Sequence, residues 1–459
     1  MRALITLSIL ILIGACSSNK SETFDLIISN INLIDGTGNP IKNNTNVLIQ
    51  GEKIVAIRED ISQVTAKKTI EGKGKYMIPG LFDAHFHFLY DTQSNERSLN
   101  QLIHFGVTSI LVPSGFLGSY ENLKKLDSLE SNEGITSPHI YYTSLITTIQ
   151  GAHPMKTYGA SLYKDSLTVN IIKNKDHITH IVNEAKANGA IALKLMVEDG
   201  PLPPFVSRIS SEYIESMALE GRKQDIPLFT HVNDMEEVKL SVNNGTKSLM
   251  HFIGVNIDWE RDLETIDKIN KDSISWVTTI MVGKAILYPL NKQWMKSEHW
   301  SVFGKDELEI LQDSDGELAN QSRMILNAFV GNENISMEEL LSPALKDINR
   351  LNALGVNIVT GTDVGGQSYI LPGISVHEEM QLLQLGGMNP LDIIRSTSRN
   401  AAFMLGILDD YGTVEPGKYA DLVILENNPL VDISNTLSIV DVIKNGKIQV
   451  RIETNANKR

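Results

Sequence analysis

The feature that most constrains the fold is a regular alternation of apolar and helical segments across residues 78–406. Apolar runs of strand length recur there, and the stretches between them have helical spacing and often end near glycine. Eight such runs can be counted: YMIPGLFD, VTSILV, HIYYTSL, AIALKLM, IPLFTH, KSLMHF, SWVTTIM and VNIVTGTD. This pattern predicts an α/β protein with a (β/α)8 TIM barrel, whose chemistry sits at the carboxyl ends of the strands. A doubly wound open sheet is the alternative, but no glycine-rich phosphate loop follows the first strand.

The two ends of the chain follow a different pattern. The N-terminal part contains FDLIISNINLID and TNVLIQGEKIVAIRED, and the C-terminal part contains ADLVILENNPL and VDVIKNGKIQVRI. These runs indicate short antiparallel strands joined by turns rich in Gly, Pro and Asn. We therefore expect one small β-sandwich domain built from both chain ends, residues 24–77 and 407–459, beside the barrel of residues 78–406.

The first residues are typical of an export signal. The stretch MRALITLSILILIGACSSNK has an early positive charge, an apolar run too short to span a bilayer comfortably, and small residues before Cys16. Its IGAC ending resembles the lipobox of bacterial lipoproteins, which implies a signal peptide over residues 1–15, lipidation of Cys16 and a polar tether over residues 16–23. Ser17 after the cysteine resembles lipoproteins sorted to the outer membrane. An ordinary signal peptide with an unmodified cysteine is the alternative.

Composition and charge exclude some partners. The chain has 459 residues, of which 42% are hydrophobic and 21% are charged, which is ordinary for a soluble globular protein. Its formal net charge of -14 disfavours binding to nucleic acid or to an anionic membrane face, and no Lys/Arg cluster offers a local exception. Cys16 is the only cysteine, so no disulfide can form within the chain. Formation of a homo-oligomer is left open.

Polar residues stand at the ends of several predicted strands. His85 and His87 follow the first strand in GLFDAHFHFLYD, and residues two apart in an extended strand share a face, so their imidazoles can grip one metal ion. A bare pair of this kind is also typical of half-buried histidines on a strand. The other strand-end residues that can serve as ligands or ligand precursors are Lys194, His231, His251 and Asp363. Convergence of all six on one rim is hard to explain by packing.

The order of these motifs resembles the amidohydrolase superfamily of metal-dependent hydrolases. The resemblance runs from LIDGTGNP through MIPGLFDAHFH to STSRNAAFMLGILDDYGTVEPGKYADLVILENNPL, and favours the imidazolonepropionase-related and dipeptidase-like branches. It implies that His85 and His87 bind the more buried metal, that His231 and His251 bind the second, and that Asp363 binds the first and handles protons. Lys194 lies where many members carry a carbamylated lysine that bridges both metals.

The chemistry of these residue types agrees with that implication. Two divalent ions, with zinc as the expected metal, take neutral imidazole and carboxylate ligands and lower the pKa of bound water toward about 7. Asp363 can then act as general base and later pass the proton to the leaving amine. A lysine in an apolar strand is costly to bury unless its charge is neutralised, and a carbamate at Lys194 would replace the cation by an anion with two oxygens.

We therefore expect an exported, lipid-anchored enzyme on the periplasmic side of the outer membrane, acting on a small-molecule substrate. Its predicted reaction is hydrolysis of an amide-type C–N bond in a dipeptide, an N-acyl amino acid or a cyclic amide. The alternatives are an esterase-type member of the superfamily and a surface lipoprotein that binds a nutrient on this scaffold without turning it over.

Two loop features have two interpretations each. The segment AILYPLNKQWMKSEHWSVFGKDELEILQD before Asp363 is either an active-site lid or a packing insertion. His153, just past the third strand, either contacts substrate or bonds to nearby backbone. We assign no chemistry to the remaining histidines, which are His104, His139, His177, His180, His299 and His377.

Overall fold

The computed structural model describes residues 22–88, 92–114, 119–130, 136–158, 167–201, 203–291, 294–365 and 370–453. The expected signal peptide, Cys16 and most of the tether lie outside the described residues. No helix within these ranges is long and apolar enough to cross a membrane.

The central element is a curled parallel sheet. Its strands in spatial order are β14 (Asn357–Val359), β13 (Ser275–Val277), β12 (Ser248–Met250), β11 (Leu228–His231), β10 (Ala192–Met196), β8 (His139–Ile149), β7 (Val107–Val112) and β6 (Leu81–Asp83). Most of these short runs are buried along their whole length, as expected of parallel strands with both faces covered. An additional strand, β9 (Val169–Ile172), pairs with β8 outside this path and was not predicted.

Hydrogen bonds between the residues that follow β6 and β14, the first and last of these strands along the chain, complete the ring. The backbone N–H of Ala84 donates to the carbonyl of Thr360 over 3.1 Å, and just beyond the strands the N–H of His87 donates to Val364 over 2.7 Å. Phe86 and Val364 form an isolated parallel bridge at the same place. The predicted (β/α)8 barrel is therefore confirmed.

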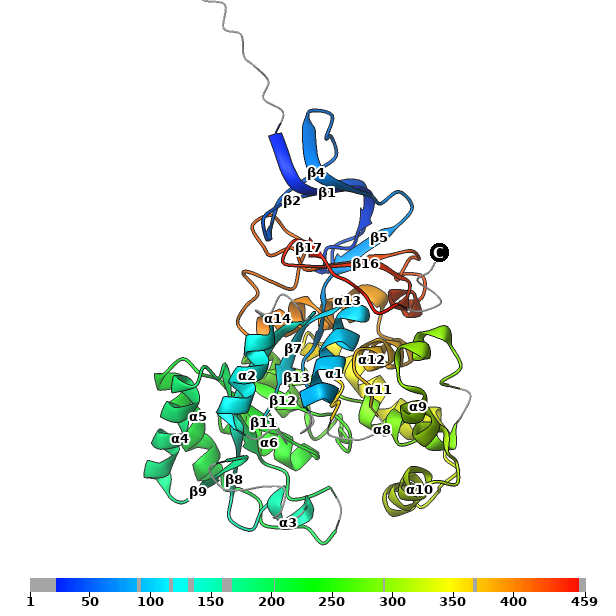
Figure 1. Ribbon diagram of the computed structural model, residues 1–459. Coiled ribbons are helices and arrows are strands. Elements are labelled where there is room, and N and C mark those ends of the chain that lie inside the picture. Colours follow the sequence, from blue (N-terminus) through cyan, green and yellow to red (C-terminus); the bar gives the residue numbers. More distant parts are fainter. Residues whose placement is uncertain are drawn as a thin grey trace, which may run out of the picture.

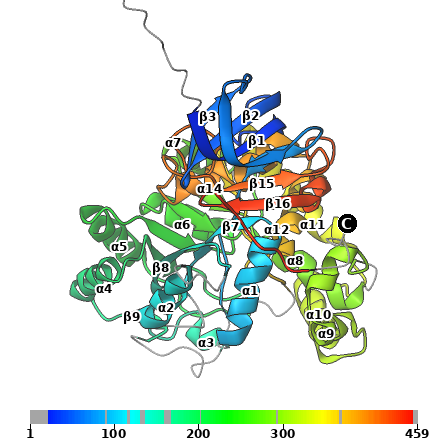
Figure 2. The same cartoon turned by 45° about the horizontal axis from the view of Figure 1, so that its top comes forward.

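Helices surround the barrel, as Figures 1 and 2 show. They are α1 (Thr92–His104), α2 (Tyr120–Glu130), α3 (Met155–Tyr158), α4 (Lys175–Ala187), α5 (Ser211–Lys223), α6 (Met235–Asn243), α7 (Leu263–Lys271), α8 (Met281–Ala285), α9 (Lys305–Gln312), α10 (Glu317–Val330), α11 (Met337–Ala353), α12 (Ile374–Leu385), α13 (Pro390–Ser396) and α14 (Arg399–Met404). Short 3-10 turns lie at Tyr288–Leu290, Glu298–Val302 and Ile433–Leu437. Local sequence fixes several starts: Asp234 with Glu237 and Ser336 with Glu339 form capping boxes on α6 and α11.

A second sheet is built from both chain ends and lies at the end of the barrel near α13 and α14 (Figure 1). Its order is β17 (Lys447–Ile448), β16 (Ile439–Lys444), β15 (Leu422–Leu425), β5 (Tyr76–Pro79), β1 (Glu22–Leu33), β2 (Lys42–Gln50) and β3 (Lys53–Arg58), and β4 (Val64–Glu71) also pairs with β1. The expected small β-domain from both ends is confirmed. The prediction that all its strands are antiparallel is wrong, because β1 pairs in parallel with β4 and β5.

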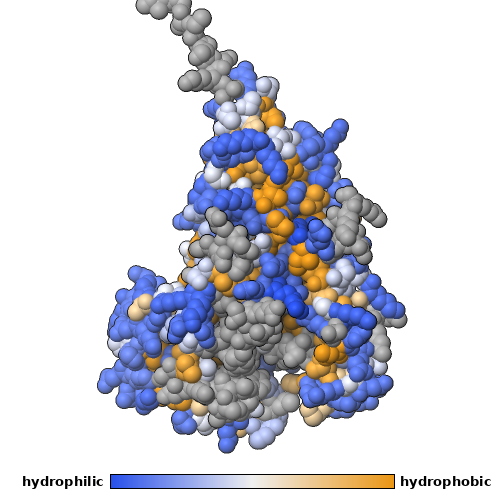
Figure 3. All heavy atoms as spheres, in the orientation of Figure 1, coloured by the Kyte–Doolittle hydropathy of each residue, from blue (hydrophilic) through white to orange (hydrophobic). Residues whose placement is uncertain are grey.

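The small sheet encloses an apolar core of its own. Ile28, Val47, Met77, Leu422 and Ile443 belong to this cluster, so residues from the two ends of the chain pack together. On the face seen in Figure 3, apolar atoms also reach the surface over this part of the molecule, between hydrophilic side chains.

The run YMIPGLFD is not one barrel strand as predicted. Tyr76–Pro79 belongs to the small sheet, and only Leu81–Asp83 belongs to the barrel, so the expected domain boundary after Met77 falls within β5. Gly80 makes the crossing, and its N–H donates to the carbonyl of Asp421 in the small domain over 2.8 Å. A Cβ at Gly80 would lie 2.1 Å from the hydroxyl of Thr108, so only glycine fits where the chain passes between the two sheets.

The end of the barrel next to the small sheet is closed by an apolar plug. Inward residues such as Phe82, Ala192 and Phe229 form one cluster with Ala402 and Met404 of α14. Polar residues that lie further along the same strands therefore face the opposite end of the barrel, where α3 lies (Figure 1).

Candidate metal centre

Strand periodicity brings several of the predicted ligands to the open end of the barrel. Ala192 and Phe229 belong to the plug, and Lys194 and His231 stand two residues beyond them on β10 and β11. Because residues two apart on a strand share a face, both side chains point into the barrel just above the plug. His251 directly follows β12, and Asp363 follows β14 by four residues.

His85, His87 and Asp363 form one group of ligand atoms, which we call the first group. Oδ1 of Asp363 lies 3.5 Å from Nε2 of His85 and 3.2 Å from Nε2 of His87. Nδ1 of His87 donates to the carbonyl of Ser114 over 2.6 Å, which directs Nε2 toward Asp363. The ligand atoms of the three residues all lie within 4.8 Å of one another, so one metal ion can contact them together.

His153, Glu198 and His231 form the second group. Nε2 of His153 lies 3.8 Å from Oε2 of Glu198, and Nε2 of His231 is hydrogen-bonded to the same oxygen. Their ligand atoms also lie within 4.8 Å of one another. Nδ1 of His153 is hydrogen-bonded to the hydroxyl of Thr157 over 2.6 Å.

His251 connects the two groups. Its ring centroid lies 4.4 Å from that of His85 and 4.2 Å from that of His231. Nδ1 of His251 is hydrogen-bonded to the hydroxyl of Thr279 over 2.9 Å, while Nε2 has no hydrogen-bond partner among the described residues. His251 and Asp363 both have positive φ, 76° and 64°, a strained conformation that is typical of functional positions.

Lys194 is buried among these ligands. Its ammonium nitrogen has no hydrogen-bond partner among the described residues, and the side chain is 1% exposed. Burial lowers the pKa of Lys194 to about 7, although Asp363 and Glu198 act in the opposite direction. A neutral amine is therefore accessible at this position near neutral pH.

The protonation states of the histidines suit metal binding. Burial, together with nearby histidines and Lys194, holds the pKa of His85, His231 and His251 well below the ordinary value. Neutral imidazole is the form that binds a metal. Burial alone would raise the pKa of Asp363, but the contact with His87 and the neighbouring His251 bring it below its usual value, so this carboxylate is ionised.

The donor set fits divalent cations. Imidazole nitrogens and carboxylate oxygens are ordinary ligands of zinc and similar ions. At this centre, four buried polar atoms have no hydrogen-bond partner among the described residues: Nδ1 of His85, Nζ of Lys194, Oε1 of Glu198 and Nε2 of His251. Such a concentration of unpartnered polar atoms is unusual for a folded interior and is expected where a ligand belongs.

Sequence reasoning missed two residues of this centre. Glu198 stands four residues after Lys194, on the same face if the strand is continued, and that spacing was the available signal. Asp83 is fully buried, and burial raises its pKa to about 7. Its Oδ1 accepts hydrogen bonds from the N–H groups of His85 and Thr362, so it ties the two ligand-bearing loops together.

Two of the other histidines have partners far from the ligand groups. His139 pairs with Asp421 of the small domain over 3.1 Å. His377 is hydrogen-bonded to the hydroxyl of Thr436 and the carbonyl of Phe105. Both contacts join the barrel to neighbouring segments.

The segment expected to be either a lid or an insertion begins within α8 and ends just past α9. Its residues Met295, Trp300, Phe303 and Leu311 are buried in the main apolar core, and Phe303 stacks on Phe105 of the first βα unit. These contacts favour the packing interpretation for this part of the segment.

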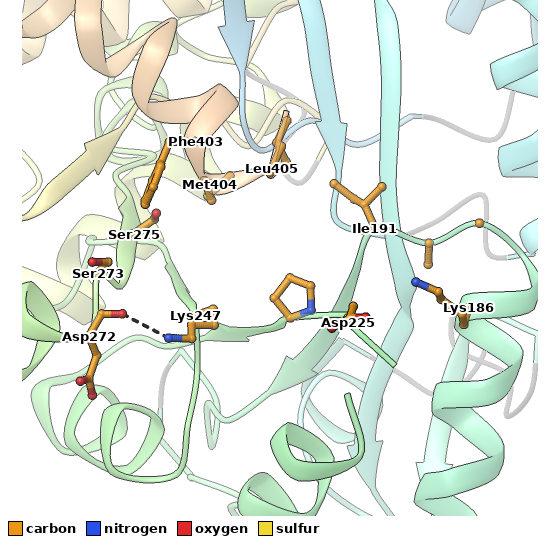
Figure 4. Close-up of a pocket in the computed structure, with 14 residues that line it drawn as sticks. Lys186, Ile191, Asp225, Lys247, Asp272, Ser273, Ser275, Phe403, Met404 and Leu405 are labelled. Atoms are coloured by element: carbon orange, nitrogen blue, oxygen red, sulfur yellow. Dashed lines mark hydrogen bonds between the residues drawn. The ribbon is translucent and has the colours of Figure 1, made fainter. Parts of the chain in front are cut away.

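A cavity of about 650 Å³ lies at the other end of the barrel (Figure 4). It is lined by residues that precede or begin β10 to β13 and by residues 403–406, on the side of the plug away from the ligand groups. Lys247 on its wall donates to the carbonyl of Asp272 over 3.2 Å. None of the ligand residues lines this cavity, so it is separate from the metal centre.

Comparison with known proteins identifies the family. A family model described as the amidohydrolase family matches residues 76–449. The chain is 24% identical over 430 residues to an adenine deaminase of Desulforamulus reducens, covering 93% of this chain and 58% of that protein. It is 22% identical over 393 residues to an imidazolonepropionase of Caldanaerobacter subterraneus subsp. tengcongensis, covering 83% and 84%.

Among solved structures, a Xaa-Pro dipeptidase with bound methionine in the active site superposes with a TM-score of 0.69. The identity is 20%, and the match covers 92% of this chain and 99% of the other. This likeness shows a shared fold. The predicted superfamily and the prediction of a hydrolase acting on C–N bonds are confirmed at this level: the chain belongs to the amidohydrolase family.

Proposed function

We propose that this protein is a two-metal amidohydrolase that cleaves the amide bond of a dipeptide, an N-acyl amino acid or a cyclic amide. The observation that carries the proposal is the presence of two ligand groups at the same end of one barrel, with His251 4.4 Å from a ring of the first and 4.2 Å from a ring of the second. The likeness to the Xaa-Pro dipeptidase fold favours substrates of dipeptide size.

The residues have distinct tasks in this proposal. His85, His87 and Asp363 hold one divalent ion, and His231 and His251 hold the other. The ions, zinc in our proposal, supply an electrophile for the carbonyl oxygen and make a water molecule more acidic. Asp363 is partly buried and ionised, so its carboxylate can take a proton from the attacking water and return it to the leaving amine.

We also propose that Lys194 is carbamylated. The neutral amine adds to carbon dioxide through a new N–C bond and releases one proton, so the side chain becomes an anion. Support comes from the burial of Lys194 and from the absence of a hydrogen-bond partner for its nitrogen among the described residues. Two carbamate oxygens would bridge the two ligand groups.

The test is metal analysis of the purified protein together with a screen of dipeptides, N-acyl amino acids and cyclic amides. We expect close to two divalent ions per chain and turnover of members of at least one class. His85→Ala should abolish turnover. Full activity of a metal-free preparation would refute the mechanism. Binding of an amide without product in metal-replete protein would favour the nutrient-binding alternative, and turnover of esters alone would favour an esterase.

We further propose that the enzyme is a lipoprotein anchored through Cys16 in the outer membrane. The support is the ILIGACSSNK sequence, since a short apolar run, small residues and a single cysteine occur together there. Acyl chains contribute about 0.8 kcal/mol per buried CH₂, so several chains anchor a protein stably. Wild type should fractionate with membranes and Cys16→Ala should not; equal solubility of the two would refute the anchor.

A further inference from the structure

We propose that Glu198 and His153 join His231 and His251 as ligands of the second divalent ion. The centre then contains a carboxylate ligand on the β10 loop in addition to Lys194 on the strand itself. This inference rests on the proposed two-metal function and deepens it, because it assigns the donor atoms of the second ion.

The first argument is convergence of the three ligand atoms. Nε2 of His153, Oε2 of Glu198 and Nε2 of His231 come from the loop after β8, the loop after β10 and the end of β11, and they lie within 4.8 Å of one another. Glu198 is 5% exposed and His153 is 1% exposed. A proton shared between Nε2 of His231 and Oε2 of Glu198 accounts for that pair alone. It explains neither the approach of Nε2 of His153 nor Oε1 of Glu198, which has no hydrogen-bond partner among the described residues. A divalent ion in place of that proton can bind all three side chains at once.

The second argument comes from a buried glutamate nearby that is fully satisfied. Oε1 of Glu237 accepts a hydrogen bond from the N–H of Asp199 over 3.1 Å and forms an ion pair with Arg208 over the same distance, and Oε2 accepts from the N–H of Asn233. Glu198 differs, because its Oε1 has no hydrogen-bond partner among the described residues. A buried glutamate with a purely structural role would be expected to have partners for both carboxylate oxygens, as Glu237 does.

The third argument is that neighbouring side chains hold the three ligand residues in position. Glu237 accepts hydrogen bonds from the N–H of Asp199, next to Glu198, and from the N–H of Asn233, two residues after His231. One side chain therefore fixes the segments after β10 and β11 relative to each other. Thr157 holds Nδ1 of His153 and leaves Nε2 toward Glu198. Outer contacts of this kind are the usual means by which metal ligands are oriented.

The donor set also indicates the kind of cation. The imidazole nitrogens of His153, His231 and His251 and the carboxylate oxygen of Glu198 are the donor types found in zinc sites. A site made for a hard ion such as magnesium would be expected to consist mainly of oxygen ligands.

The experiment measures metal binding by the full chain, reconstituted with Zn²⁺ or Co²⁺ after chelation. We expect two ions per wild-type chain by elemental analysis, and one ion in Glu198→Gln, with at least a tenfold loss of affinity for the second. The visible absorption of bound Co²⁺ should lose the contribution of one site in the variant. Retention of the first ion in Glu198→Gln shows that the variant is folded.

A matched control is Asp234→Asn, which removes a nearby negative charge while keeping a side chain that can cap α6. We expect this variant to bind two ions. The inference would be overturned if Glu198→Gln bound two ions with wild-type affinity. It would also be overturned if Glu198→Gln and Asp234→Asn lost the same affinity for the second ion.

The metal content of the wild type, His85→Ala and Glu198→Gln distinguishes failure of this inference from failure of the two-metal function. If the wild type binds one ion that persists in His85→Ala and is lost in Glu198→Gln, the two-metal function fails and the Glu198 site stands. If that single ion is lost in His85→Ala and kept in Glu198→Gln, both fail.

Discussion

Replacement of Asp83 should show how much this side chain stabilises the junction between the two loops of the first ligand group, which follow β6 and β14. Asp83 has no exposed surface, and its Oδ1 accepts from the N–H of His85 over 3.2 Å and from the N–H of Thr362 over 3.0 Å. Its Oδ2 accepts from the hydroxyl of Thr362 over 2.6 Å. Asp83→Ala therefore leaves two buried backbone N–H groups without an acceptor, while the hydroxyl can rotate to another partner.

The magnitude follows from the number of lost acceptors. Each buried N–H without a partner costs about 1–3 kcal/mol, so the two together cost about 2–6 kcal/mol. Asp83→Asn is the matched control, because its amide oxygen can serve both N–H groups and Thr362 can accept from the amide nitrogen. We expect Asp83→Ala to be less stable than Asp83→Asn by that amount.

The assay is urea unfolding of metal-free protein followed by circular dichroism, since bound metal would add its own stabilisation to the native state. The two variants should differ in midpoint with the same slope. A difference below about 0.5 kcal/mol, within the range of ordinary surface substitutions, would refute the assigned role of Asp83. Metal affinity measured on the same samples should fall more in the alanine variant.

Three further changes have defined outcomes. Gly365→Ala places a Cβ 2.2 Å from the carbonyl oxygen of His87 at a φ of +82°, so it should lower the melting temperature and the metal content; unchanged values would contradict the close approach. Thr279→Val removes the hydroxyl that bonds Nδ1 of His251 and should weaken metal binding about 10- to 100-fold, which a competition titration with a chelating dye would measure. Lys194→Ala should lose most of the metal and activity, with partial recovery in short carboxylates; full metal content would exclude a bridging role.

The barrel could be predicted from the sequence because its strands are buried on both faces. Strands β7, β12 and β13 therefore appear as short continuous apolar runs, separated by helices whose amphipathic spacing and caps are local properties. The helices α6 and α11 begin at capping boxes that can be read directly from four consecutive residues. The sequence was therefore sufficient to predict the elements that are determined by local hydrophobic spacing and capping residues.

The exchange of sheets at Gly80 could not be predicted in the same way. The run YMIPGLFD is apolar on both sides of the Pro-Gly pair, and both parts are buried strands. What separates them is the close approach of Thr108 to Gly80 and the hydrogen bond to Asp421, which is more than three hundred residues away in sequence. Such contacts exist only once the fold has formed.

The acidic residues of the centre were missed for a related reason. A carboxylate near a strand end is most often solvated, so Asp83 and Glu198 carry no distinct signal one at a time. Histidines at several strand ends are informative because their joint occurrence is rare, whereas acidic residues are common throughout this chain. Burial, which the sequence does not record, distinguishes Asp83 and Glu198 from the exposed acidic residues of the chain.

Closure of the barrel and assembly of the first ligand group depend on the same backbone segments. The N–H of Asp363 donates to the carbonyl of His85 over 2.8 Å, and the N–H of His87 donates to Val364. These bonds join the loops after β6 and β14, the first and last strands of the ring. A metal ion held by His85, His87 and Asp363 would cross the same junction, so binding energy at the centre would also stabilise the closed barrel. Removal of metal should therefore lower the melting temperature of the whole barrel cooperatively, and a scan in which chelation changes activity but not unfolding would refute this coupling.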